Sequence, residues 1–174
     1  FEGSGSVRCI TPAAGKARRV VVSLLHDDAV IEASVSFSYH EVVSVSSAEP
    51  AVGLLSGGTV VRVRGRAFDP SASASMMVRI GDSTTLVRAH VLSSTLLEVT
   101  TPAQERTGMV SIEVSLNGVD FSADEVLFEY QRMARLDEVA PSRGPSSGGS
   151  ALVLTGDGFS RRSAMLGYSF ARFN

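Results

Sequence analysis

The sequence has little of what many binding and redox proteins rely on: it contains one cysteine, no tryptophan and only three tyrosines among 174 residues. Two of those tyrosines, Tyr39 and Tyr130, occupy equivalent positions of a repeat described below. The chain therefore lacks the aromatic surface that an accessory carbohydrate-binding module would need. A lone cysteine, Cys9, has no partner for a disulfide within this chain.

Concentrated charge and long apolar runs are also absent. The chain has 16 basic and 18 acidic residues, a net charge of −2, and no run of like charge longer than a pair such as Arg18-Arg19 or Arg161-Arg162. This composition does not support binding to nucleic acid or to an anionic membrane. Apolar runs such as residues 20–22 are far too short to cross a bilayer, and no signal-peptide pattern begins at Phe1. We predict no direct membrane insertion by this segment.

Motifs for catalysis are missing as well. Residues 144–148 match the G-x-S-x-G pattern of a serine nucleophile, which requires a strand, a sharp turn and a helix. Here Pro145 lies beside the serine and a strand follows, so the segment is predicted to be a turn. We therefore predict that the chain is not an enzyme and has no catalytic residues.

Metal ligands do not cluster in the sequence either. His26, His40 and His90 each stand alone, without a second ligand at a zinc-site spacing. The acidic pairs 27–28 and 137–138 lack the spaced oxygen ligands of a calcium loop. We predict solvated loop charges at these pairs, and no metal or cofactor.

What the sequence does contain is a repeat. Residues 56–68, SGGTVVRVRGRAF, return at 147–159 as SGGSALVLTGDGF, with serine, three glycines and phenylalanine in register. Each copy predicts a glycine turn that leads into a short strand with apolar residues at every second position. The repeated structural positions are Pro50, Gly57, Gly58, Gly65 and Phe68 in one copy, and Pro141, Gly148, Gly149, Gly156 and Phe159 in the other.

The repeat period is about 91 residues, because Pro50 and Pro141 are 91 positions apart and so are Tyr39 and Tyr130. We therefore expect three domains: residues 1–40 as the C-terminal part of a first, 41–131 as a complete second, and 132–174 as the N-terminal part of a third. No Gly/Ser-rich or Pro-rich linker separates them, which predicts joints of limited freedom.

Seven short segments of the middle unit predict strands, and seven strands in about 90 residues are typical of a β-sandwich. We expect Val61, Val63, Val110, Ile112, Val114 and Phe128 in its core. The pair Asn117-Gly118 predicts a hairpin turn into the last strand. The predicted strands are residues 42–46, 59–64, 76–80, 85–91, 96–100, 109–116 and 125–130.

These motifs together resemble the IPT/TIG domain, the immunoglobulin-like module of plexins, Met-type receptors, some transcription factors and many large extracellular repeat proteins. The resemblance rests on Pro-x6-Gly-Gly-(Thr/Ser), the valine-rich strand, an Arg-Ile-Gly turn at 79–81, TPA at 101–103, VSLNGVDFS at 114–122 and F-x-Y at 128–130. It covers residues 41–130 and the matching parts of both neighbours. It implies an all-β chain of tandem immunoglobulin-like sandwiches.

The resemblance also implies a disulfide. In extracellular members a Cys-x-Phe-Gly turn often bonds a cysteine just before a Thr-Pro-Ala-like turn, and Cys9 occupies the second position. The middle unit has Val78 and Val99 at the two positions, an apolar pair in place of a bridge. Cys9 would then bond a cysteine upstream of Phe1, which indicates an oxidising compartment. The alternative is that Cys9 is a buried free thiol.

The resemblance leaves several functions open. A structural or adhesive segment of an extracellular array, working through contacts with neighbouring repeats or copies of itself, explains the repeat and the missing catalytic groups. The stalk of a plexin-like or Met-like receptor at the cell surface is the alternative. A DNA-binding factor is disfavoured by the near-neutral charge. The sequence does not identify the partner, the number of repeats or the oligomeric state.

Overall fold

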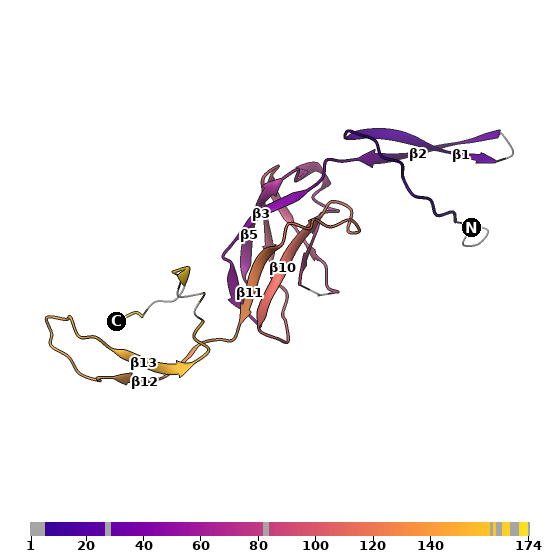
Figure 1. Cartoon of the computed structure of the whole chain (residues 1–174). Helices are drawn as coiled ribbons and strands as arrows, with labels where there is room; N and C mark the ends of the chain where they lie inside the picture. The colour runs from indigo at the N-terminus through magenta and orange to yellow at the C-terminus, as the bar shows by residue number, and fades with distance from the viewer. Residues whose placement is uncertain are drawn as a thin grey trace. The chain divides into compact units, whose positions relative to one another are not determined.

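The computed structural model of the chain describes residues 6–26, 29–81, 84–160, 162, 165–167 and 171–173. It separates into two compact units, Phe1–Val42 and Val43–Asn174. The first unit contains a hairpin in which β1 (Arg18–His26) pairs antiparallel with β2 (Ala29–Tyr39), with a bulge between Val21 and Ser23 (Figure 1). The second unit contains a sandwich and one further two-stranded sheet.

The sandwich consists of two facing sheets (Figure 1). One has the order β3-β5-β9-β8, formed by Ser44–Glu49, Val60–Arg66, Leu96–Thr100 and His90–Ser93. The other has the order β4-β11-β10-β6-β7, formed by Val52–Leu54, Val126–Gln131, Gly108–Ser115, Met77–Ile80 and Val87–Arg88. The pairs are antiparallel except for β4 beside β11, and a short 3-10 turn, η1 (Pro70–Ala72), precedes β6. The predicted all-β sandwich is confirmed.

The alternation of the strands builds the core between the sheets. On β5, Val61 and Val63 are fully buried, while the alternate residues Val60, Arg62 and Arg64 are exposed. Of the predicted core residues, Val110 is only partly buried and packs at the margin of the core. The others are buried, and so are Val78 and Val99, one in each sheet. Full burial of such side chains stabilises the fold by about 1.5–3 kcal/mol each.

At both borders of the sandwich, the polypeptide crosses from one sheet to the other. The single strand predicted at 85–91 is two strands, β7 and β8, which belong to different sheets. The crossing occurs at Ala89, which is buried and whose N–H donates to the Met76 carbonyl at 3.1 Å. On the opposite border the chain crosses from β3 to β4 at Pro50. Strand β4 was not predicted from the sequence. The edge strands β4, β7 and β8 are therefore short, which limits edge-to-edge pairing.

The turn at Asn117-Gly118 exists but is not a tight hairpin. The carboxamide oxygen of Asn117 accepts hydrogen bonds from the N–H groups of Val119 and Asp120, which closes a side-chain turn. The chain then continues to Val126, the first residue of β11, which pairs with Ile112. The predicted connection of these two strands is confirmed, since β10 and β11 pair antiparallel, but side-chain hydrogen bonds of Asn117, and not a two-residue backbone turn, reverse the chain.

The remaining sheet reproduces part of the sandwich, displaced by 91 residues. Strand β12 (Arg135–Ala140) pairs with β13 (Val153–Asp157), and Arg135 faces Asp157 as Ser44 faces Arg66. The bulge recurs as well, after Leu136 in β12 and after Val45 in β3. Two segments with similar sequences thus adopt the same register.

A close approach of backbone and ring explains why glycine occupies position 65. A Cβ atom there would collide with the Ser44 carbonyl oxygen and would lie 2.6 Å from the end of the Phe68 ring. Gly156 is under the same steric constraint. A Cβ atom there would collide with the Arg135 carbonyl oxygen and would lie 2.9 Å from the ring of Phe159. The glycine allows the first strand and the phenylalanine to pack against the second strand.

Tyrosine closes the sandwich and recurs in the first unit. The Tyr130 hydroxyl donates to the Pro102 carbonyl at 2.9 Å, and the Tyr39 hydroxyl donates to the Pro12 carbonyl at 2.8 Å. Each tyrosine also packs edge to face on the phenylalanine two positions earlier, with ring centroids 5.1 Å apart in the sandwich and 5.0 Å apart in the first unit. The same anchor therefore forms twice.

The two copies differ at the residue after β5, and this difference predicts a stabilising substitution. Ala67 has a φ of 60°, whereas its counterpart Gly158 has a φ of 75°. Because a Cβ disfavours this left-handed region, we expect Ala67→Gly to raise the free energy of unfolding by about 0.5–1 kcal/mol. Urea denaturation measures the change. Gly58→Ala is the matched control, since Gly58 has a φ of 81° and open space around it, and it should lower stability by about 1 kcal/mol. A less stable Ala67→Gly variant would contradict the backbone argument.

Loss of the Tyr130 hydroxyl should destabilise the sandwich. We expect Tyr130→Phe to lower the free energy of unfolding by about 1–2 kcal/mol, because the Pro102 carbonyl loses its donor. Tyr39→Phe, in the other unit, should leave the unfolding of the sandwich unchanged. Equal stability of Tyr130→Phe and the natural chain would show that the anchor has no energetic role.

The same tyrosine predicts a dependence on alkaline pH. Burial raises the pKa of the Tyr130 hydroxyl above its usual 10.0, although hydrogen bonds with Thr101 and Gln104 act to lower it. The folded chain thus holds this proton more tightly than the unfolded chain, so the stabilisation is complete below pH 10 and is lost as pH rises through the folded pKa. Denaturation series at increasing pH should show a steeper loss for the natural chain than for Tyr130→Phe.

Candidate functional site

The repeated positions singled out from the sequence form the scaffold and not a chemical site. Gly65, Phe68 and their counterparts make the close packing described above. Gly57 needs its left-handed φ of 71°, and a Cβ there would lie 2.6–2.7 Å from the backbone of residues 101–103. The other positions are turns or strand ends: Gly58, Gly148 and Gly149 have positive φ, and Pro50 and Pro141 follow cis peptide bonds.

Cys9 is exposed and is a free thiol in this chain. The alternative interpretation, a buried free thiol, stays a prediction, because this exposure applies to residues 1–174 alone. The expected bond to a cysteine outside residues 1–174 stays a prediction, because its partner would have to come from elsewhere.

The residues that the structure describes contain no group of three or more His, Cys, Asp or Glu side chains that could hold a metal ion. The pair Asp27-Asp28 lies outside the described residues, and Asp137 is engaged by Arg135 at 2.9 Å. His40 contacts the Glu41 carbonyl through Nδ1 at 2.8 Å, and His90 is exposed on β8. In the described part of the chain, no helix has the length and apolar character needed to cross a membrane.

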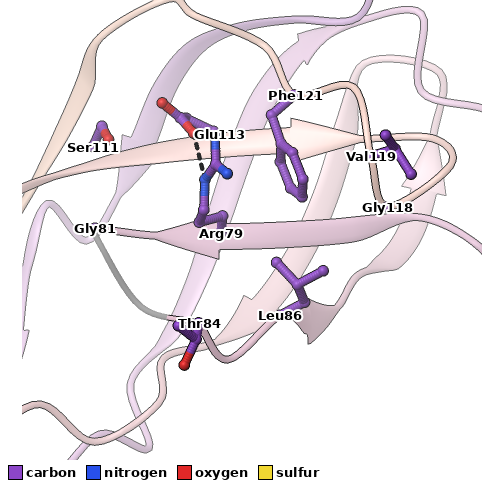
Figure 2. A pocket seen from close by; sticks show the side chains of 9 residues that line it. All are labelled: Arg79, Gly81, Thr84, Leu86, Ser111, Glu113, Gly118, Val119 and Phe121. Carbon is purple, nitrogen blue, oxygen red and sulfur yellow. Dashed lines mark hydrogen bonds and ion pairs between the residues drawn. The ribbon is translucent and has the colours of Figure 1, made fainter.

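A hollow on the outer face of the five-stranded sheet surrounds a charged pair (Figure 2). Arg79 of β6 and Glu113 of β10 are directly opposite each other, and the Arg79 Nε donates to the carboxylate at 2.7 Å. The guanidinium also lies over the Phe121 ring, 4.2 Å from its centroid. The open hollow has a volume of about 650 Å³ and is completed by Gly81, Thr84, Leu86, Ser111, Gly118 and Val119.

The charges in this hollow compensate each other. Arg79 directs its guanidinium to Glu113, and the aromatic ring covers it from one side (Figure 2). The side chains are 40% and 21% exposed, so the pair contributes only about 0.2–1 kcal/mol to stability. We interpret the cluster as a cross-strand pair that joins β6 to β10.

A second charged surface lies on the outer face of the four-stranded sheet. Arg62, Arg64 and Arg66 alternate along β5 with residues that point inward or lack a side chain, and all three are exposed. Arg62 donates to the Glu98 carboxylate on β9 at 3.0 Å. In the described part of the chain, Arg64 and Arg66 form no ion pair. This surface, which we call the β5 arginine face, has three arginines and two carboxylates, Glu49 and Glu98, and therefore a net charge of +1.

Part of this surface can be recognised in the sequence. Arg62 and Arg64 alternate with Val61 and Val63, which indicates that the two arginines face outward, and Arg66 follows the glycine. The alternation signal continues through that glycine, so the third arginine could have been found. Which arginines have acidic partners depends on strand register, which the sequence alone does not specify.

The comparisons with known proteins agree with this architecture. The model of the IPT/TIG domain family matches residues 44–130. Fibrocystin-L of Mus musculus is 32% identical over 130 residues, and Plexin-2 of Caenorhabditis briggsae is 30% identical over 135 residues. These matches cover 73% and 72% of this chain but only 3% and 8% of the two relatives.

Longer but weaker similarities also exist. Fibrocystin of Canis lupus familiaris is 29% identical over 166 residues, which is 91% of this chain and 4% of that protein. Among solved structures, the full extracellular region of plexin A4 aligns with a TM-score of 0.46 and 17% identity, over 80% of this chain and 12% of that one. The chain thus spans a small fraction of the proteins that it matches.

The family match covers the sandwich from its first strand to the closing tyrosine, the segment whose glycine, phenylalanine and tyrosine contacts are described above. The chain belongs to the IPT/TIG domain family.

Proposed function

We propose that this chain is a non-catalytic segment of a large extracellular repeat protein, in which successive IPT/TIG domains form an extended array that acts through protein–protein contacts. The observation that carries the proposal is the recurrence of one architecture at an interval of 91 residues, with the same strand register and the same tyrosine anchor. An extracellular location is supported by the relatives, which are fibrocystins and plexins.

The domain boundaries belong to this proposal: residues 1–40 end a first domain, 41–131 form a second and 132–174 begin a third. The exposed apolar side chains of the hairpin in the first unit support it, because Phe37 is 39% exposed whereas its counterpart Phe128 is fully buried. Strands β12 and β13 likewise expose Leu136 and Leu154, the counterparts of the buried Val45 and Val63. Completed neighbouring sandwiches would cover these side chains. The similarity to fibrocystin, which extends well beyond residues 44–130, also supports it.

The short connections between strands support an extended arrangement. Only residues 40–43 separate β2 from β3, and only residues 132–134 separate β11 from β12. Connections of this length, without Gly/Ser-rich sequence, restrict the angles between consecutive domains. Three of the four edge strands of the sandwich, β4, β7 and β8, are short, which disfavours lateral pairing of sheets at those edges. Contacts between domain ends and between sheet faces are therefore the favoured means of assembly.

The second candidate is the stalk of a plexin-like cell-surface receptor, favoured by the similarity to Plexin-2 over 72% of the chain. Both functions need the same semi-rigid joints. They differ in what accompanies the domains, because a receptor requires a membrane span and a cytoplasmic domain in the same polypeptide. The full-length gene distinguishes them.

Small-angle X-ray scattering on a segment of three complete domains tests the array. Three stacked sandwiches of about 35–40 Å each should give a radius of gyration of about 30 Å or more. A single globule of the same mass would give about 19 Å, and that value would disprove the array.

A matched control isolates the role of the joint. Eight Gly/Ser residues inserted after His40 should broaden the distance distribution and lower the radius of gyration, because the inserted linker is flexible. An unchanged scattering profile would mean that the short joint does not determine the arrangement.

A further inference from the structure

The arginines on the outer sheet faces divide into two groups by their neighbours. Arg62 lies between Glu49 and Glu98 on the adjacent strands, and Arg79 lies opposite Glu113. Arg64 and Arg66 on β5 and Arg88 on β7 instead face neutral residues on the neighbouring strands, and of these only Arg64 and Arg66 lie on the same strand. Opposite-charge neighbours stabilise a sheet, so the arginines of the first group already have a role within the fold.

Arg64 and Arg66 have no such role. Arg64 faces Ser47 on β3 and Leu96 on β9, and Arg66 faces Ser44. Their guanidinium groups, with five donors each, point away from the core on an exposed face and meet no carboxylate among the described residues. They are available for an external acceptor.

The third copy shows that the fold does not require arginine at these positions. Val153, Thr155 and Asp157 of β13 occupy the places of Arg62, Arg64 and Arg66 in the same register. Asp157 lies opposite Arg135 in the register, whereas Arg66 of the middle domain lies opposite Ser44. Of the two copies that contain this strand, only the middle domain has arginine at these positions, so the arginines are not needed for the fold.

We propose that the β5 arginine face of the middle domain binds an extended acidic segment of a partner protein. Arginine pairs with carboxylate in a planar, two-pronged geometry, and alternate residues of a strand are about 6.6 Å apart, the same spacing as alternate residues of an extended peptide. Carboxylates at every second position of a peptide therefore match Arg64 and Arg66. Leu92, which is 46% exposed, and the partly buried Leu96 add the apolar contact typical of a protein interface.

A sulfated polysaccharide fits this face less well. Binding of a polyanion gains from long-range attraction by many cations, but this face has a net charge of only +1 and the whole chain has a net charge of −2. The inference deepens the proposed function by specifying one partner contact. It is tested separately, because binding to this face does not depend on the arrangement of neighbouring domains.

The experiment titrates the ¹⁵N-labelled 174-residue chain with a peptide of alternating glutamate and threonine and, separately, with a heparin hexasaccharide. We expect the peptide to shift the amide signals of β5 and β9, with Arg64 and Arg66 among the largest changes. The affinity should fall as salt is raised. Replacing both arginines by threonine, the residue that the third copy has at Thr155, should weaken binding about fivefold or more, because two charged contacts are lost.

The control removes the same two charges elsewhere. Arg88→Thr with Arg106→Thr, on β7 and in the loop before β10, should leave the peptide affinity within about twofold. Three results would overturn the proposal: no peptide-induced shifts at millimolar concentration, equal weakening by both double variants, or binding of heparin but not of the peptide to this face. A double variant that keeps the amide spectrum of a folded sandwich but loses peptide binding would support it.

Discussion

The close contact at Gly65 is the constraint on which the sandwich depends. The carbonyl of the first strand and the ring of Phe68 both occupy the space that a side chain at position 65 would need. This contact holds β3 against β5, and β5 supplies Val61 and Val63 to the core opposite Ile112 and Val114 of the other sheet. At the far end of the domain, the buried Tyr130 hydroxyl fixes the last strand to the Pro102 carbonyl. Between these two contacts, the buried side chains of the two sheets pack against each other.

These constraints leave the outer faces of the sheets free to vary. The same register accommodates Arg62, Arg64 and Arg66 in one copy and valine, threonine and aspartate in the other. An architecture of this kind repeats its inward-facing residues and changes its surface from domain to domain, so each domain of an array can have its own partner.

The sequence predicts those parts of the fold that depend on local pattern. Alternation of apolar residues places Val61, Val63, Ile112 and Val114 in the core, and the repeat identifies Gly65 and Phe68 as structural. It does not predict where a strand changes sheet, because the crossing at Ala89 depends on burial and on a hydrogen bond to a distant carbonyl. It also does not predict the turn at Asn117, where side-chain hydrogen bonds replace a backbone turn.

The β5 arginine face was only partly visible for the same reason, since charge compensation is a property of pairing between strands. An arginine beside a glutamate in the sheet and an arginine beside a serine look alike in the sequence. Register distinguishes Arg62 from Arg64, and tertiary structure is required to establish register.

Hydrogen exchange tests the central claim, that the segments on either side of the sandwich are parts of further domains of the same fold. The measurement compares amide exchange in β1, β2, β12 and β13 in the 174-residue chain with the same strands in a chain extended in both directions until each neighbouring domain is complete. If the account is correct, exchange of these strands slows by about tenfold or more and approaches that of β10 and β11. If their exchange is unchanged by the added sequence, the flanking strands do not belong to such domains and the repeat architecture is contradicted.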